Sequence, residues 1–478
     1  MPKLVISGFS YWGILLEDSP LLNKSGLHGP FTPRLIARCT LSDGSIGWSE
    51  VPCNRGVLAV LEQLLSLIVG TKATVRDVQA LLKTVVVKSS DLAKQLGLTD
   101  ERGSATFDKG VTNHLRAAIQ MAAYDAMARS QGIPLADLLG GSKGRQRSEV
   151  SFNAYLFWVG NVAGSGLHYQ ETPQHVWDNP LAKIRDQPVL DIPSLVNLAK
   201  VFHQHVMPGS TLTKLKAGVL DPSTEATAII AMDTAFNQTM RFVPDPNGAW
   251  DVPTAVRITK YLKERLGDRL PYVEDLVNGQ KAMAEVYAQT GVPQATNMCA
   301  ANIKEHETAV SSKAIQITLG GDPHYMGGSD LAVELSFLCR DKWGIKFAQH
   351  SNTHGEISAL HTLHMGAAAA THDFPFDTHY PWQMGRGILP QPLTFKEGGI
   401  MEISKAPGIG VDIDLDRLMI LHERLLKANS SSRSLTDRDD GPPADMVYGG
   451  WARPDKRKFQ WFFAGVQDSL NVCGTKDA

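Results

Sequence analysis

The chain has 478 residues, of which 43% are hydrophobic and 20% charged, so it is long enough for two or three hydrophobic cores. Its net charge of -2 comes from 47 basic and 49 acidic residues spread along the sequence, and no basic block points to nucleic acid or an anionic membrane. Five cysteines without a C-x-x-C pair argue against a disulfide framework and a structural zinc site. The N-terminus is unlike a signal peptide, and no uninterrupted apolar stretch is long enough to span a membrane. We therefore expect a cytoplasmic protein that acts on small molecules.

Residues 1–145 contain two kinds of pattern. Stretches such as RLIARCTLSDGSIGWSEV alternate apolar and polar residues, whereas TNHLRAAIQMAAYDAMARSQG, which ends at Gly132, has helical spacing. Strands and helices mixed in this way predict an α+β domain.

Residues 146–385 contain short strand-like runs that alternate with helical segments. Seven such runs follow one another: SEVSFNAYLFWVG, STLTKLKAGV, MRFVPDPNG, LPYVEDLVNG, VPQATNMCA, KAIQITLGG and GIKFAQHSN. The helical segment DVPTAVRITKYLKERLG begins at an Asp-x-Pro and stops at Gly267, which is typical of a capped helix. Repeated strand–helix units favour parallel strands with crossover helices. A (β/α) TIM-type barrel is the simplest arrangement, although a doubly wound sheet has the same local pattern.

The spacing of polar residues favours the barrel. Intervals of 29, 29, 23, 25 and 28 residues separate six side chains at or near the C-terminal ends of successive runs: Lys216, Asp245, Glu274, Asn297, Asp322 and His350. The strand ends of a closed barrel converge on one mouth, whereas those of an open sheet spread along an edge. Residues 386–478 return to strands and a helix, followed by the polar loop ANSSSRSLTDRDDGPPAD, and we expect them to complete the N-terminal domain as a cap.

Three of these residues have the chemistry of a metal site. Asp245, Glu274 and Asn297 offer oxygen ligands from three consecutive strands, and hard oxygen donors without Cys or His suit Mg²⁺. A single Asp or Asn at a strand end is commonly a turn former or a helix cap. Three residues in phase weaken that alternative.

Lys214 and Lys216 in TLTKLKAGV lie two residues apart on a strand, so both side chains point to the same face. A divalent cation and a second ammonium favour the neutral form of a lysine, as a general base requires. We expect Lys216 to be the base and Lys214 to hold an anion. On the other side, His350 and Asp322 are predicted to form a hydrogen-bonded acid/base dyad.

The motifs at the second to seventh strands, KLK, DPNGAW, YVED, ATNM, GGDPH and QHSNTH, together resemble the enolase superfamily and within it the glucarate dehydratase-like group. The resemblance covers nearly the whole chain, through SGLHGPFTPR, RGSATFD and NAYLFWVGN before these motifs and DTHYPWQ and RDDG after them. It implies a lid built from both termini over a Mg²⁺-binding barrel, with the ligands and bases named above. It also implies that a diacid substrate contacts His28, Thr106, Tyr155, Asn247, Ser351, Asn352, His379 and Arg438.

The resemblance implies a Mg²⁺-dependent dehydratase that removes the proton α to a carboxylate of an aldarate such as D-glucarate and expels the β-hydroxyl as water. VPCNRG follows WSE where the family has a Gly-rich acidic loop, so another acid-sugar dehydratase or an epimerase, acting on galactarate or a tartrate-like acid, stays open. A zinc amidohydrolase is disfavoured because His203 and His205 lie in a helical run, where positions i and i+2 face apart. A non-catalytic member would have lost an acid/base or ligand position, and none is lost. We also expect a homo-oligomer.

Overall fold

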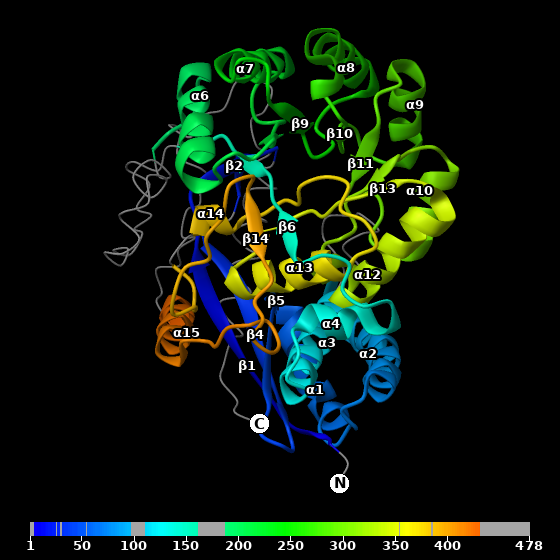
Figure 1. The fold of residues 1–478 in the computed structure, drawn as a ribbon, viewed down its shortest axis with the longest axis vertical. Coiled ribbons are helices and arrows are strands. Elements are labelled where there is room, and N and C mark those ends of the chain that lie inside the picture. The colour runs from blue at the N-terminus through cyan, green and yellow to red at the C-terminus, as the bar shows by residue number, and fades with distance from the viewer. Residues whose placement is uncertain are drawn as a thin grey trace.

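The computed structural model describes residues 4–24, 26–28, 31–53, 55–96, 110–160, 187–352, 354–383 and 386–430. Figure 1 shows two parts, with an α/β barrel at the top and a capping domain of strands and helices at the bottom. The predicted fold class is therefore confirmed, whereas the domain boundaries at residues 145 and 385 and the homo-oligomer stay predictions. Among the described residues, no helix is both long and apolar enough to cross a membrane.

The capping domain is built on an antiparallel sheet in the order β1-β4-β5. Its elements are β1 (Ile6–Glu17), β2 (Leu21–Asn23), β3 (Gly26–His28), β4 (Phe31–Leu41), β5 (Ile46–Pro52), α1 (Arg55–Ile68), α2 (Val75–Gln95) and α3 (Gly110–Ser130). Helix α3 lies so close to β5 that a Cβ atom on Gly47 would come within 2.1 Å of the backbone nitrogen of Ala126, and only glycine permits this approach. The side chain of Ser49 donates a hydrogen bond to the backbone oxygen of Ala118 in α3 (2.8 Å).

The chain from the cap to residue 383 leads into the barrel and forms its parallel strands, which alternate with helices. In chain order the elements are α4 (Leu135–Gly140), the 3₁₀ turn Gly141–Lys143, β6 (Glu149–Ser151), β7 (Ala154–Leu156), α6 (Ile192–Val201), a π-helical turn (Phe202–Val206), β8 (Leu212–Lys216), α7 (Pro222–Ala235), β9 (Arg241–Asp245), α8 (Val252–Leu266), the 3₁₀ turn Gly267–Arg269, β10 (Val273–Glu274), α9 (Gln280–Thr290), β11 (Gln294–Thr296), α10 (Ile303–Ser311), β12 (Ile317–Thr318), α11 (Pro323–Met326), α12 (Ser329–Leu338), a π-helical turn (Cys339–Trp343), β13 (Lys346–Phe347), α13 (Glu356–Ala368) and α14 (Tyr380–Gln383). Helix α8 has the predicted caps, Asp251 before it and Gly267 after it.

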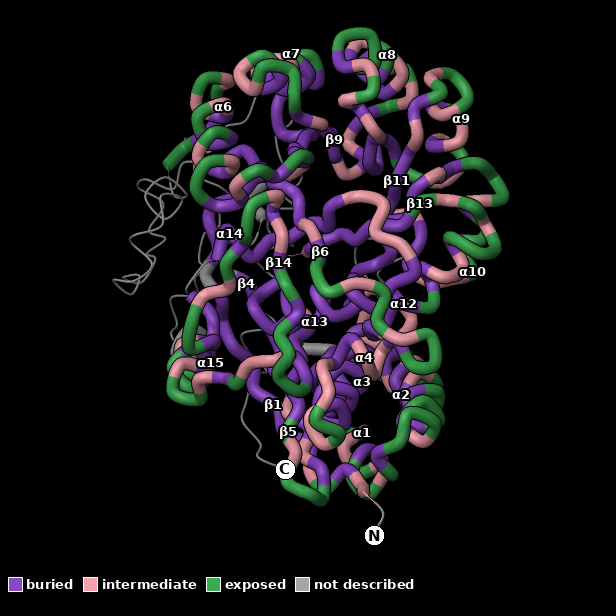
Figure 2. The backbone as a smooth tube through the Cα atoms, viewed as in Figure 1, coloured by how far each residue is buried: buried purple, intermediate pink, exposed green. Residues whose placement is uncertain are grey.

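Parallel pairing follows the chain order, β7-β8-β9 and β10-β11-β12-β13. The segment around Phe376 supplies the eighth strand position, because its backbone bonds to both neighbours. The backbone N–H of Asn153 donates to the oxygen of Phe376 (2.9 Å), and that of Asp377 donates to the oxygen of Gln349 (3.1 Å). The interior is filled by buried apolar side chains from successive strands: Leu212, Val243, Tyr272, Ala295, Ile317, Leu319 and Ala348. Figure 2 shows that the strands inside the barrel are buried, whereas the surrounding helices have exposed residues on their outer faces.

The C-terminal segment touches both parts of the molecule. Strand β14 (Ile400–Glu402) pairs with β6 in the barrel, and α15 (Leu415–Ser430) then packs on β1 of the cap. The ring of His422 in α15 lies 2.6 Å through Nδ1 from the backbone oxygen of Gly13. The expected return of this segment to the N-terminal domain is thus seen in α15.

Candidate active site

Two lysine side chains of β8 reach the same carboxylate. Nζ of Lys216 lies 2.5 Å from Oδ2 of Asp245, and Nζ of Lys214 lies 3.3 Å from the same oxygen. Both side chains leave the strand on one face, as the two-residue spacing predicts. The ring of Tyr155 on neighbouring β7 lies 4.7 Å from Nζ of Lys214 and 5.4 Å from Nζ of Lys216, measured to its centroid. These contacts add cation–π attraction for both ammonium groups.

Lys214 is surrounded by three carboxylates. Besides Asp245, its Nζ lies 2.5 Å from Oε2 of Glu274 and 2.6 Å from Oδ2 of Asp377. Burial opposes the charge on Lys214, but Asp377 and Glu274 outweigh it and hold the pKa of the lysine well above its usual range. Lys214 therefore stays an ammonium, which suits it to stabilising negative charge.

Glu274 and Asp275 are neighbours in the sequence but have different partners. Oε1 of Glu274 accepts a hydrogen bond from Nδ2 of Asn297 (3.0 Å). Asp275, at a φ of 39°, accepts instead from Oγ1 of Thr296 (2.5 Å) and from the backbone N–H of Asn297 (3.0 Å). Glu274 therefore joins the lysines, while Asp275 holds the backbone at the end of β11.

His350 joins the same group from the loop after β13. Its Nδ1 lies 3.4 Å from Oδ2 of Asp377, 3.6 Å from Oε1 of Glu274 and 3.5 Å from Nζ of Lys214. Burial opposes the imidazolium, but hydrogen bonds to Asp377 and Glu274 outweigh it and raise the pKa of His350. We call this group the lysine cluster, and its members are Lys214, Lys216, Asp245, Glu274, His350 and Asp377.

Asp377 is not among the residues predicted from the sequence. It is buried, accepts a hydrogen bond from Nδ2 of Asn153 (2.6 Å) and contacts both Lys214 and His350. Its position two residues before His379 in DTHYPWQ was the available signal, since residues i and i+2 of an extended segment share a face.

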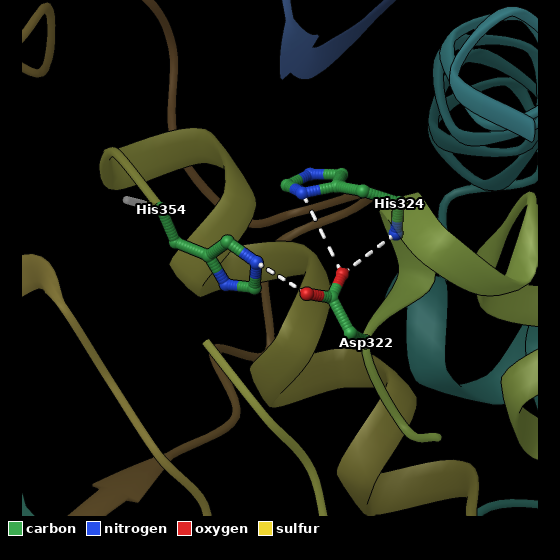
Figure 3. A group of neighbouring side chains, drawn as sticks. All are labelled: Asp322, His324 and His354. Carbon is green, nitrogen blue, oxygen red and sulfur yellow. Dashed lines mark hydrogen bonds and ion pairs between the residues drawn. The ribbon is translucent and has the colours of Figure 1, made fainter. Parts of the chain in front are cut away.

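Asp322 has a different partner from the one predicted. Its Oδ2 lies 3.2 Å from Nε2 of His354, and its Oδ1 accepts from the backbone N–H of His324 (2.9 Å) and lies 3.6 Å from Nδ1 of the same residue. Figure 3 shows both rings directed at the carboxylate. The hydrogen bond expected from His350 is thus replaced by one from His354, four residues later, because His350 points to Asp377 and Glu274. We call Asp322, His324 and His354 the histidine cluster.

Asn247 lies beside the lysine cluster. Its backbone N–H donates to Oδ1 of Asp245 (3.0 Å), and its Nδ2 lies 3.6 Å from Sδ of Met298. A φ of 51° places Asn247 in the left-handed region, which asparagine tolerates better than most residues. This turn holds the end of β9 against the site.

The other predicted substrate contacts make protein contacts of their own. The backbone N–H of His379 donates to Oγ of Ser351 (3.0 Å), and its ring Nε2 lies 2.6 Å from Oδ2 of Asp18 in the cap. Nδ2 of Asn352 donates to the hydroxyl of Tyr325 (2.5 Å). The side chain of His28 and all of Thr106 and Arg438 lie outside the described residues, so their predicted contacts stay predictions.

The donor set fits Mg²⁺. Asp245 and Glu274 are both 0% exposed, and burial together with the charge of Asp245 raises the pKa of Glu274 to about 7. A divalent cation relieves such repulsion between buried carboxylates, and Asn297 adds a third hard oxygen donor. Glu274, His350 and Asp377 also bring ligand atoms within 4.8 Å of one another, but an imidazole ligand suits zinc better than magnesium.

Comparison with known proteins agrees with this geometry. The family model "Enolase C-terminal domain-like" matches residues 197–417, and "Mandelate racemase / muconate lactonizing enzyme, N-terminal domain" matches residues 32–140. A probable glucarate dehydratase from Streptomyces coelicolor is 34% identical over 455 residues, which cover 94% of this chain and 98% of that protein.

Two solved structures have similar folds. An enolase from Pseudomonas fluorescens with bound magnesium, potassium and tartrate superimposes with a TM-score of 0.77 and 31% identity, covering 90% of this chain and 94% of that chain. An enolase from Mycobacterium smegmatis complexed with tartrate gives a TM-score of 0.75 and 30% identity, covering 89% and 93%. The chain therefore belongs to the enolase superfamily, and it resembles the glucarate dehydratase-like members of that superfamily.

Proposed function

We propose that this protein is a Mg²⁺-dependent hydro-lyase that dehydrates aldarates such as D-glucarate to keto-deoxy diacids. The observation that carries the proposal is the lysine cluster, in which two ammonium groups and an imidazole meet three buried carboxylates. Asp245, Glu274 and Asn297 would hold Mg²⁺, which when bound stabilises negative charge on a substrate carboxylate. The tartrate bound by two relatives is itself a hydroxylated diacid, which supports this substrate class.

The protein's own residues divide the remaining work. The proton α to a carboxylate is a weak acid, so the negative charge that develops on the enediolate must be stabilised. Lys214, kept charged by Asp377 and Glu274, supplies part of that stabilisation. Lys216 takes the α-proton on one side of the substrate. His350, whose protonated form is favoured by Asp377 and Glu274, donates a proton to the β-hydroxyl, which leaves as water.

Epimerisation is the second candidate function. Lys216 and His350 contact the carboxylates of one cluster from different strand ends. A base on each side of an enediolate can remove the α-proton from one face and return it to the other. In that case the substrate would change configuration without losing water.

One screen tests both functions. The purified protein is incubated with an acid-sugar library, with Mg²⁺ or with EDTA, and keto products are detected with semicarbazide, while proton NMR in D₂O detects epimers. We expect magnesium-dependent keto product from at least one aldarate. The double variant K216A/H350N should lose that product, whereas K342A, at an exposed lysine paired with Glu307, should retain it. Absence of any magnesium-dependent product from every aldarate would refute the dehydratase proposal.

A further inference from the structure

The histidine cluster is connected to the capping domain through one serine. Nε2 of His324 lies 3.0 Å from Oγ of Ser358 in α13. The same oxygen accepts a hydrogen bond from Nη2 of Arg34 in β4 (3.2 Å) and donates one to the backbone oxygen of Glu50 in β5 (3.3 Å). Nε of Arg34 lies 2.7 Å from Oε1 of Glu50. All four side chains are buried, so this path runs through the interior from the cap to the barrel.

Glu50 also holds the start of α13. Its Oε1 accepts from the backbone N–H of Gly355 (2.8 Å), and its Oε2 accepts from that of Ser358 (3.1 Å). A carboxylate at a helix N-terminus satisfies backbone N–H groups that have no partner within the helix and complements the helix dipole. Because His354 directly precedes Gly355, Glu50 fixes the backbone next to that ring as well.

Asp322 is held at both oxygens and lies next to the strand segment that carries His350. Its Oδ1 accepts a hydrogen bond from the backbone N–H of His324, and its Oδ2 lies within hydrogen-bond distance of Nε2 of His354. The backbone N–H of His350 donates to the oxygen of Leu319 (3.2 Å), and that of Gly321 donates to the oxygen of Ala348 (3.3 Å). These two hydrogen bonds connect the backbone beside Asp322 to the backbone that carries His350.

We propose that His324, His354 and Ser358 are positioning residues. They form a network with Asp322, Arg34 and Glu50, in which His324 and Ser358 connect Asp322 to the Arg34–Glu50 pair of the cap, and this network keeps His350 in place for its role in the active site. The proposal rests on the proposed function, because it assumes that Lys216 and His350 are the two acid/base groups of the active site and holds that the network supports only His350. Lys216 is held by Asp245, and the hydrogen bonds and ion pair of the network, all between described residues, involve neither of these two side chains. Loss of the network should therefore impair His350 and spare Lys216.

A metal ion is a weaker explanation for the histidine cluster. Ligand atoms of Asp322, His324 and His354 do lie within 4.8 Å of one another. However, the cluster offers a single carboxylate, and the guanidinium of Arg34 is close enough to disfavour positive charge on His324. A further cation would meet the same repulsion.

The first test follows exchange of the α-proton with D₂O for two aldarates that differ in configuration at the reacting α-carbon, one for each base. The variant H354L removes the donor to Asp322, and we expect the exchange rate of the epimer that depends on His350 to fall about 10- to 100-fold. The exchange rate of the other epimer should change by less than about twofold, because exchange through Lys216 does not require His350 to protonate the leaving hydroxyl. H354Q, whose amide nitrogen can replace Nε2 as the donor, should recover most of the loss.

S358A should give a smaller loss with the same preference for one epimer, and R34K should do likewise because lysine lacks the paired donors of arginine. S336A is the matched control, since Ser336 is also a buried serine but bonds to Val333 and Ala370. Equal loss for both epimers in H354L and S358A would show that these residues only maintain the fold, and the proposal would be wrong.

A second measurement needs no turnover and so separates the network from the proposed function. Histidine-selective ¹⁵N NMR of the intact protein should show His354 with a proton on Nε2, because that atom faces a carboxylate oxygen. The signal, assigned by its absence in H354Q, should shift in D322N. An unprotonated Nε2 at neutral pH would overturn the network, whereas failure of the unaltered protein to convert either epimer would count against the dehydratase alone.

Discussion

The lysine cluster and the histidine cluster both bury carboxylates, but they balance the charge in different ways. Asp377 faces a full positive charge, and Lys214 lowers its pKa to about 2 despite burial. Asp322 instead faces a backbone N–H and two imidazoles, and burial, His354 and Arg34 hold the pKa of His324 well below its usual range. The first arrangement can hold and neutralise substrate charge. The second can orient a carboxylate without placing a second full charge beside it.

The largest effect is expected when the lysine cluster loses a carboxylate. In D245N or E274Q, Mg²⁺ binding should be lost and turnover of both epimers should fall by at least about 10²- to 10³-fold, because charge stabilisation is removed for either base. Isothermal titration with Mg²⁺ and circular dichroism would check binding and folding. Normal metal content and activity in both variants would refute the ligand set.

A split between epimers is expected when only the lysine base is changed. In K216R the guanidinium keeps its proton, so one α-epimer should lose proton exchange by about 10²- to 10⁴-fold. The other epimer should still exchange through His350. Deuterium incorporation from D₂O measures each rate separately, and equal loss for both epimers would mean that Lys216 stabilises charge in general.

Asp377 contacts both Lys214 and His350, so D377N should weaken these two contacts at once. Lys214 would keep its buried charge with one carboxylate fewer, and leaving a buried charge uncompensated costs about 3–5 kcal/mol of unfolding free energy as an upper range. Urea unfolding measures the change. The control E402Q breaks an exposed pair with Lys396 and should cost about 0–1 kcal/mol. A similar small loss in D377N would show that Asp245 and Glu274 suffice.

The barrel and the convergence of its strand ends were predictable because closed parallel sheets place those ends together. The regular intervals between strand ends predicted that Lys216, Asp245 and Glu274 lie close together. The two-residue spacing of Lys214 and Lys216 predicted that both lysines share one face of their strand. Asp377 was missed because the eighth strand position is a short segment, DFPFDTHY, without a following helix of the kind that marked the other seven.

The partner of Asp322 could not be predicted from spacing. His350 and His354 both follow β13 within a few residues, and side-chain rotamers decide which ring reaches the carboxylate. His350 contacts Asp377, and the backbone next to His354 is bonded by Glu50, and both of these acids come from distant parts of the chain. The connection from the cap to α13 is therefore a tertiary property, without a local sequence signal.

The smallest predicted effect concerns how stability depends on pH. Helix α13 carries buried histidines that are neutral at pH 7. Burial lowers the pKa of His364 to about 3 and that of His361 to about 4, and Nδ1 of His364 accepts the backbone N–H of Ala136 (3.1 Å). Because the folded pKa lies below the unfolded value of about 6.5, the stabilisation is fully present above that pH and is lost as the pH falls toward 4.

Removing one such histidine should flatten the pH dependence. In H364N the side-chain oxygen can still accept from Ala136, but the titration is gone, so the slope of unfolding free energy near pH 5 should be shallower by about 1.4 kcal/mol per pH unit. Urea unfolding at pH 7, 6 and 5 measures it. H205N, at an exposed histidine, should leave the slope unchanged. If H364N also leaves it unchanged, His364 accepts a proton in the folded protein, and α13 tolerates charge as the lysine cluster does.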